Sequence, residues 1–147
     1  MSPLVALTGG TGFLGRHVTA AFAAAGWRVR LLARRPEAAG RAHETVRGSL
    51  SDQGALSALV DGADAVVHLA GAIRARSRTA FMAVNRDGTA AVGRAWRAEA
   101  PSARFVLVSS MAAREPGLSD YAASKAAGEA ALDGESAVVL RPCQRRP

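Results

Sequence analysis

Tyr121 and Lys125 are the residues whose types and spacing most directly suggest chemistry. They are the only tyrosine and the only lysine in 147 residues, and four positions separate them, which places both on one face of a helix. A phenol holds its proton too tightly to act unaided near neutral pH, and a neighbouring ammonium stabilises the phenolate. The pair predicts proton exchange with a substrate oxygen; the structural alternative is a tyrosine packed against a lysine stem on a surface helix.

A cluster of glycines, TGGTGFLG at 8–15, lies between an apolar run at 3–7 and a helical pattern at 13–25. Gly9, Gly12 and Gly15 allow close approach of the backbone to a ligand. The start of the following helix offers free amides and the positive end of its dipole. This context predicts a loop that binds the pyrophosphate of a dinucleotide.

The second apolar run, at 28–33, ends where such folds distinguish NAD from NADP. Ala33 is followed there by Arg34 and Arg35, without a carboxylate that would hold the ribose hydroxyls of NAD. The planar guanidinium is suited to a phosphate group. We expect NADP as the preferred cofactor, with Arg34 as the contact and NAD as the alternative; two solvated loop arginines are the structural interpretation.

Strand-like runs alternate with helical patterns along the whole chain. Because the strand-like runs are apolar throughout, they indicate a parallel sheet covered on both faces. The second expected helix lies in the segment 51–62, and we expect Ser51 to cap it. The fold class predicted is α/β, a Rossmann-type doubly wound sheet of order 3-2-1-4-5-6 with helices on both faces. The expected strands are 3–7, 28–33, 44–47, 63–71, 103–110 and 136–142, and the other expected helices are 79–99 and 121–132.

Three segments together resemble the short-chain dehydrogenase/reductase superfamily: the TGxxGxxG spacing at 8–15, SSMA at 109–112 and YAASK at 121–125. The segment GGTGFLG is similar to the extended and atypical branches, which include epimerases and dehydratases. The resemblance implies hydride transfer between a nicotinamide and a substrate carbon. It assigns proton exchange to Tyr121, ribose binding to Lys125 and orientation of the substrate oxygen to Ser110, with Ser109 as the alternative.

Other segments extend this resemblance. HLAG at 68–71 resembles the family segment whose backbone lines the cofactor. Asn85 in VNRDGT resembles the family asparagine that supports the lysine through a buried polar network. The alternative for Asn85 is an ordinary helix asparagine. In GSLSD at 48–52 the family aspartate that meets adenine is replaced by Ser49, although Leu50 can still pack against the ring. The expected cofactor contacts are Gly9, Gly12, Phe13, Leu14, Gly15, Arg34, Leu50, Ala70, Gly71 and Lys125.

Composition narrows the class of protein. Hydrophobic residues make up 49% and charged residues 21%, as in an ordinary globular domain. No apolar run approaches the ~20 residues of a membrane span and no signal peptide is recognisable, so we expect a cytoplasmic protein without a membrane partner. One cysteine, Cys143, and three scattered histidines argue against a disulfide or a metal site. The net charge of +7 is spread without aromatic interleaving, which argues against nucleic acid.

The organisation expected is one NAD(P)-binding domain over 1–147. Members of the resembling family continue into a small C-terminal substrate domain, whereas this sequence ends at CQRRP, so we expect that domain to be missing through truncation, a frameshift or fragmentation. The predicted function is that of an NAD(P)-dependent oxidoreductase, epimerase or dehydratase acting on a small-molecule carbonyl or hydroxyl. A non-catalytic dinucleotide sensor or assembly factor, an inactive fragment and a homodimeric state all stay open.

Overall fold

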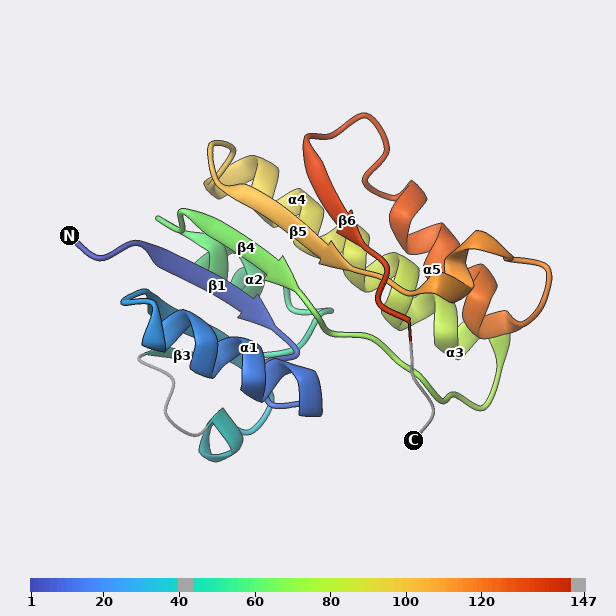
Figure 1. The fold of residues 1–147 in the computed structure, drawn as a ribbon, viewed down its shortest axis with the longest axis horizontal. Coiled ribbons are helices and arrows are strands. Elements are labelled where there is room, and N and C mark those ends of the chain that lie inside the picture. Colours follow the sequence, from blue (N-terminus) through green and yellow to red (C-terminus); the bar gives the residue numbers. More distant parts are fainter. Residues whose placement is uncertain (40–43, 144–147) are drawn as a thin grey trace.

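The computed structural model describes residues 1–39 and 44–143, which form a six-stranded parallel sheet with helices packed on it (Figure 1). The strand order is β3-β2-β1-β4-β5-β6, which confirms the predicted Rossmann-type order. The strands are β1 (Leu4–Thr8), β2 (Arg28–Ala33), β3 (Glu44–Arg47), β4 (Ala65–His68), β5 (Arg104–Val108) and β6 (Ala137–Leu140).

The helices follow the predicted alternation with two local differences. The expected helix at 79–99 consists of three consecutive segments, of which the middle one is a π-helix. The expected cap Ser51 is wrong: Asp52 caps α2, accepting from Ala55 N at 3.0 Å, while Ser51 Oγ lies 2.9 Å from Ser49 Oγ. The helices are α1 (Phe13–Ala24), α2 (Gln53–Val60), α3 (Arg78–Met82), α4 (Thr89–Glu99) and α5 (Asp120–Ala130), with the π segment η2 (Ala83–Gly88) and the short 3-10 turns η1 (Pro36–Ala39) and η3 (Met111–Arg114).

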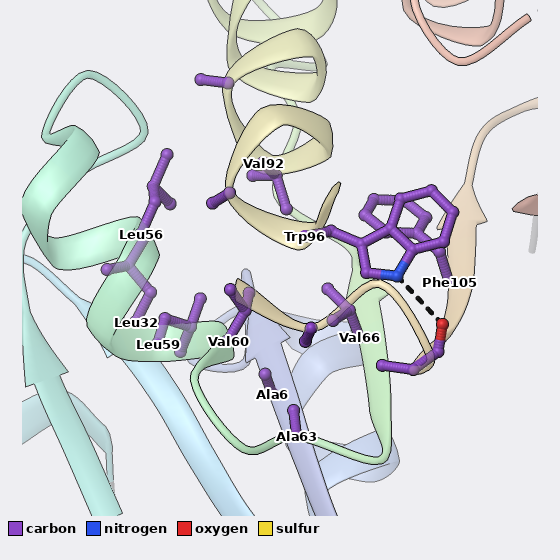
Figure 2. Packing of buried hydrophobic residues seen from close by; sticks show 14 of the residues in the cluster. Ala6, Leu32, Leu56, Leu59, Val60, Ala63, Val66, Val92, Trp96 and Phe105 are labelled. Atoms are coloured by element: carbon purple, nitrogen blue, oxygen red, sulfur yellow. Dashed lines mark hydrogen bonds between the residues drawn. The ribbon is translucent and has the colours of Figure 1, made fainter. Parts of the chain in front are cut away.

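Both faces of the sheet are covered, as predicted, because successive residues of each strand point to opposite faces. Val5 and Leu7 of β1 belong to the core on the α1 side, where Val18 and Phe22 pack against them. Ala6, between them, faces the core beneath α2 and α4. Figure 2 shows that second core, in which Leu56, Leu59 and Val60 of α2 meet Val92 and Trp96 of α4, together with Val66 and Phe105 of the sheet.

The edge strands are less buried than the central strands; the segment of β3 was expected as a weaker strand, whereas the apolar run of β6 predicted burial. Along β3, half-buried and exposed residues alternate, and Glu44 pairs there with Arg30 of β2 at 2.6 Å. On β6, Val138 is 53% exposed and Leu140 is 50% exposed. An edge strand has a neighbour on one side, so apolar composition alone overstates its burial. Within the described residues, no helix is long and apolar enough to cross a membrane.

All five strand pairs are parallel, so the segments that follow the strands gather at one edge of the sheet. Thr8, the last residue of β1, stands in register with His68, the last residue of β4. The glycine loop continues from Thr8, and the HLAG segment begins at His68. The candidate site residues therefore converge at this edge because of the topology alone.

Candidate functional site

A cavity of about 960 Å³ opens at the carboxyl edge of the sheet. This volume is in the range of small-molecule and cofactor pockets. Six of the ten expected cofactor contacts line it, namely Gly9, Gly12, Arg34, Leu50, Ala70 and Gly71. The other four do not: Phe13 and Leu14 are 86% and 47% exposed on the first turn of α1, Gly15 is buried below the loop, and Lys125 lies on α5.

The glycine loop packs closely against its own backbone and against the segment that follows β4. Gly9 has φ of +71°, and a Cβ at this position would lie 2.5 Å from the amide nitrogen of Ala70. A Cβ on Gly15 would collide with the carbonyl oxygen of Gly9. Gly12 caps α1 without a side-chain hydrogen bond, so the amides of the first helical turn have no side chain of the cap residue on them. This arrangement fits a pyrophosphate group at the positive end of the helix dipole.

Two arginines also line the cavity: Arg34 from the loop after β2 and Arg94 from α4. Ser49 also lines it. Asp87 is a lining acid, but it is paired with Arg86 at 2.7 Å, and this hydrogen bond lowers the pKa of the carboxyl. The arginine side chains of the lining therefore suit an anionic group.

The sequence reasoning missed Arg94. Its signal is helical spacing, because Asp87, Ala91 and Arg94 recur at intervals of four and three residues and so share one face. Asp87 and Ala91 also line the cavity. Arg94 can therefore be recognised as a lining residue once Asp87 and Ala91 are known to line the cavity.

Tyr121 and Lys125 lie in the first two turns of α5, which begins at Asp120. Ser119 caps this helix by accepting from Ala122 N at 3.0 Å. The Lys125 side chain is largely buried, and its Nζ donates to the carbonyl oxygen of Val108, the last residue of β5, at 3.3 Å. Burial lowers the pKa of Lys125, and the negative charge of Glu129 partly opposes this shift. The Tyr121 ring stands edge-on to Phe81 with their centroids 6.0 Å apart.

The two candidate serines follow β5 and are both buried. Ser110 Oγ accepts from Ala112 N at 3.2 Å at the start of η3, which leaves the hydroxyl hydrogen available to a ligand oxygen. Ser109 Oγ has no hydrogen-bond partner among the described residues. Since η3 packs against α5, the structure places the serine segment beside the helix that carries Tyr121 and Lys125.

Asn85 forms a buried clamp between the segment after β4 and α5. Its side chain accepts from Ala72 N at 2.8 Å and donates to Ala72 O at 2.9 Å and to Ser124 Oγ at 2.9 Å. Ser124 in turn donates to the carbonyl of Tyr121 at 2.7 Å. The network thus reaches the residue next to Lys125 rather than the ammonium itself. Ser124 was missed by the sequence reasoning, although it is the fourth residue of YAASK.

The histidines that the structure describes lie in different surroundings. His17 is exposed and stands edge-on to Phe13, His68 is fully buried at the end of β4, and His43 lies outside the described residues. Among the residues that the structure describes, no group of three histidine, cysteine or acidic side chains could hold a metal ion.

The sequence of this chain is similar to a known protein family and to a characterised relative. The profile of the NAD dependent epimerase/dehydratase family matches residues 5–144. A ceramide reductase of Caulobacter vibrioides is 50% identical over 145 residues, which cover 95% of this chain and 45% of that protein.

Solved structures agree with the sequence match. A short-chain dehydrogenase/reductase superfamily protein from Agrobacterium tumefaciens, with bound NAD, is 31% identical with a TM-score of 0.79, covering 94% of this chain and 48% of the other. The uronate dehydrogenase of the same organism, complexed with NAD, is 25% identical with a TM-score of 0.77, covering 95% and 59%. The chain therefore spans about half the length of these relatives.

Proposed function

Because the chain belongs to the NAD dependent epimerase/dehydratase family, we propose that its cavity binds a nicotinamide dinucleotide for hydride transfer at a carbonyl or hydroxyl carbon. One contact carries the proposal. Gly71 lines the cavity, and a Cβ on Gly71 would lie 3.5 Å from Lys125 Nζ. The cavity wall therefore adjoins the candidate acid/base helix, so a dinucleotide that begins at the glycine loop would end beside it.

NADP is the preferred cofactor in this proposal. Arg34 and Arg94 both line the cavity, and the acid Asp87 is already paired with Arg86. Guanidinium groups bind phosphate oxygens with charge-assisted hydrogen bonds, whereas the ribose hydroxyls of NAD need an acceptor such as a carboxylate. These contacts favour a 2′-phosphate, with Arg34 as the principal partner.

Each candidate catalytic side chain has a free hydrogen-bonding group for the reaction. When bound, the nicotinamide supplies or accepts the hydride. Lys125 donates one N–H to Val108 O, and its ammonium carries two more for the ribose hydroxyls and the phenol. Ser110 accepts from Ala112 N through its oxygen, so its hydroxyl hydrogen can still be donated to the substrate oxygen. Tyr121 exchanges the proton with that oxygen.

A lipid carbonyl of the ceramide type is the substrate class that we propose. The 50% identity to a ceramide reductase supports it. Exposed apolar side chains in the segments that follow β4 and β5 also support it. Ile73 follows β4, and Met111 and Leu118 follow β5; these three residues are 67%, 40% and 79% exposed. Apolar side chains at the edge of the site fit an apolar substrate better than a sugar.

Fluorescence titration with NADPH and NADH tests the cofactor proposal. We expect NADPH to bind more tightly, and Arg34→Gln to weaken NADPH by about tenfold while leaving NADH unchanged, since one charged hydrogen bond is lost. Arg35→Gln is the matched control, because Arg35 is the adjacent arginine and does not line the cavity. Failure of both dinucleotides to bind would refute the proposed function.

Turnover with the keto form of a ceramide tests the chemistry. We expect Tyr121→Phe to reduce kcat by at least ~100-fold without weakening NADPH, because the phenol is the proton donor. Unchanged turnover in this variant excludes the mechanism. Dinucleotide binding without any turnover of the unsubstituted chain instead favours a non-catalytic dinucleotide sensor.

A further inference from the structure

A continuous chain of buried hydrogen bonds crosses the sheet edge through His68. Thr8 of β1, His68 of β4 and Thr89 of α4 are each no more than 2% exposed. Thr8 Oγ1 lies 2.5 Å from His68 Nδ1, and His68 Nε2 lies 3.1 Å from Thr89 Oγ1. One imidazole thus connects the strand before the glycine loop to the helix behind the cavity.

The direction of every bond in this chain follows from counting protons. Thr89 donates its single hydroxyl hydrogen to the carbonyl of Asn85 at 2.8 Å, so it can only accept from His68. Nε2 of His68 therefore carries the ring hydrogen, and Nδ1 accepts from the hydroxyl of Thr8. The oxygen of Thr8 then accepts from Ala70 N at 3.2 Å. The bonds run one way, from the Ala70 amide to the Asn85 carbonyl.

This direction requires a neutral imidazole, since a second ring proton would oppose the hydroxyl of Thr8. Burial, and to a smaller extent the positive charge of Lys125, lower the pKa of His68 from its ordinary value to about 3. The ring is therefore neutral throughout the physiological range.

Both ends of the chain reach parts of the candidate site. Ala70 lines the cavity, and its amide faces Gly9 so closely that a Cβ there would lie 2.5 Å away. Asn85, at the other end, clamps Ala72 and Ser124. We propose that His68 is a positioning residue that holds the two walls of the dinucleotide cavity and the Asn85 clamp in register; this inference rests on the proposed function.

Two conservative variants separate the halves of the chain. In His68→Asn the side-chain oxygen can replace Nδ1 as acceptor for Thr8, and in His68→Gln the side-chain nitrogen can replace Nε2 as donor to Thr89. We expect His68→Leu to weaken NADPH binding by about tenfold, as for the loss of a buried hydrogen bond. His68→Asn should restore most of that affinity, and His68→Gln should restore less, because it does not hold the wall at Ala70.

Trp96→Phe is the control for a purely structural role. The indole of Trp96 makes an equally buried hydrogen bond to Ala103 O at 2.9 Å, within the core of Figure 2 and outside the lining of the cavity. We expect this variant to lose stability similarly but to bind NADPH like the unsubstituted chain at a temperature where both are folded. If His68→Leu also binds NADPH normally, the inference is refuted.

Nitrogen NMR of the imidazole tests the inference independently of any cofactor. We expect the Nε2–H tautomer between pH 5 and 8, and Thr8→Val should shift both the Nδ1 resonance and the Asn85 side-chain amide. An Nδ1–H tautomer, or an Asn85 amide indifferent to Thr8→Val, overturns the inference. If the unsubstituted chain binds no dinucleotide, the proposed function fails, and these two NMR results still decide whether His68 couples the walls.

Discussion

Acid pH should destabilise this protein through His68. The folded imidazole cannot take up a proton near neutral pH, because burial and the charge of Lys125 lower its pKa from the ordinary 6.5 to about 3. The unfolded imidazole takes up a proton below about pH 6.5. The unfolded state therefore binds more protons between pH 6.5 and 3, so the stability that a neutral His68 contributes is lost as the pH falls.

The size of the effect follows from the two pKa values. At pH 5 the unfolded imidazole is almost fully protonated and the folded one almost fully neutral. The linkage relation converts this difference into a loss of about 2 kcal/mol of unfolding free energy between pH 7 and pH 5. A domain of this size has about 5–15 kcal/mol in total, so the loss is readily measured.

Urea denaturation followed by circular dichroism at pH 7, 6 and 5 measures this loss. His68→Gln has no titrating group at this site, so its stability should fall by about 2 kcal/mol less than that of the unsubstituted chain over the same interval. His17→Gln, which removes an exposed imidazole of α1, should retain the full decline because His68 is intact. If His68→Gln and the unsubstituted chain decline in parallel, the neutral buried imidazole is refuted.

Further substitutions test the fold and the glycine loop. Gly9→Ala places a Cβ 2.5 Å from Ala70 N and should weaken NADPH binding at least ~tenfold in a fluorescence titration. Gly26→Ala is the control, because Gly26 has a φ of +82° but open space around it. It should lower the unfolding free energy in urea by only about 1 kcal/mol and leave NADPH binding unchanged. Equal effects on binding would contradict the close approach at the loop. Leu59→Ala should cost about 3 kcal/mol in the same denaturation assay, because the side chain is fully buried beneath α4; a cost below about 1 kcal/mol would contradict that packing. Asp52→Ala should lower the unfolding free energy measured in urea by about 1 kcal/mol, because Asp52 caps α2. A larger loss from Ser51→Ala than from Asp52→Ala would contradict the observed cap.

Much of the fold was predictable because its signals are local. Apolar runs of strand length alternate with helical patterns, and α1 ends just before Gly26, whose positive φ is a conformation that glycine adopts readily. The right-handed crossover rule then leaves few arrangements of parallel strands. The helix cap was predicted one residue too early, because Ser51 and Asp52 are both good caps and only the observed bond to Ala55 N distinguishes them.

The candidate site was partly predictable for a similar reason. The glycine loop and the Tyr121–Lys125 pair are each defined within eight residues, so spacing reveals them. Arg94 and Ser124 belong to the candidate site only because of the way α4 and α5 are oriented, and no local sequence pattern specifies that orientation. The roles of all these side chains in catalysis and cofactor binding stay predictions for the experiments above.

The sequence by itself determined which residues are chemically able to act and in what order the elements occur. The tertiary structure decided which of them meet. Thr8 and His68 are 60 positions apart, and His68 and Thr89 are 21 apart, yet their hydrogen bonds form one buried chain because parallel pairing of β1 with β4 brings both strand ends to the same edge. A hydrogen bond depends on distance and direction in space, and a sequence records neither for residues that far apart.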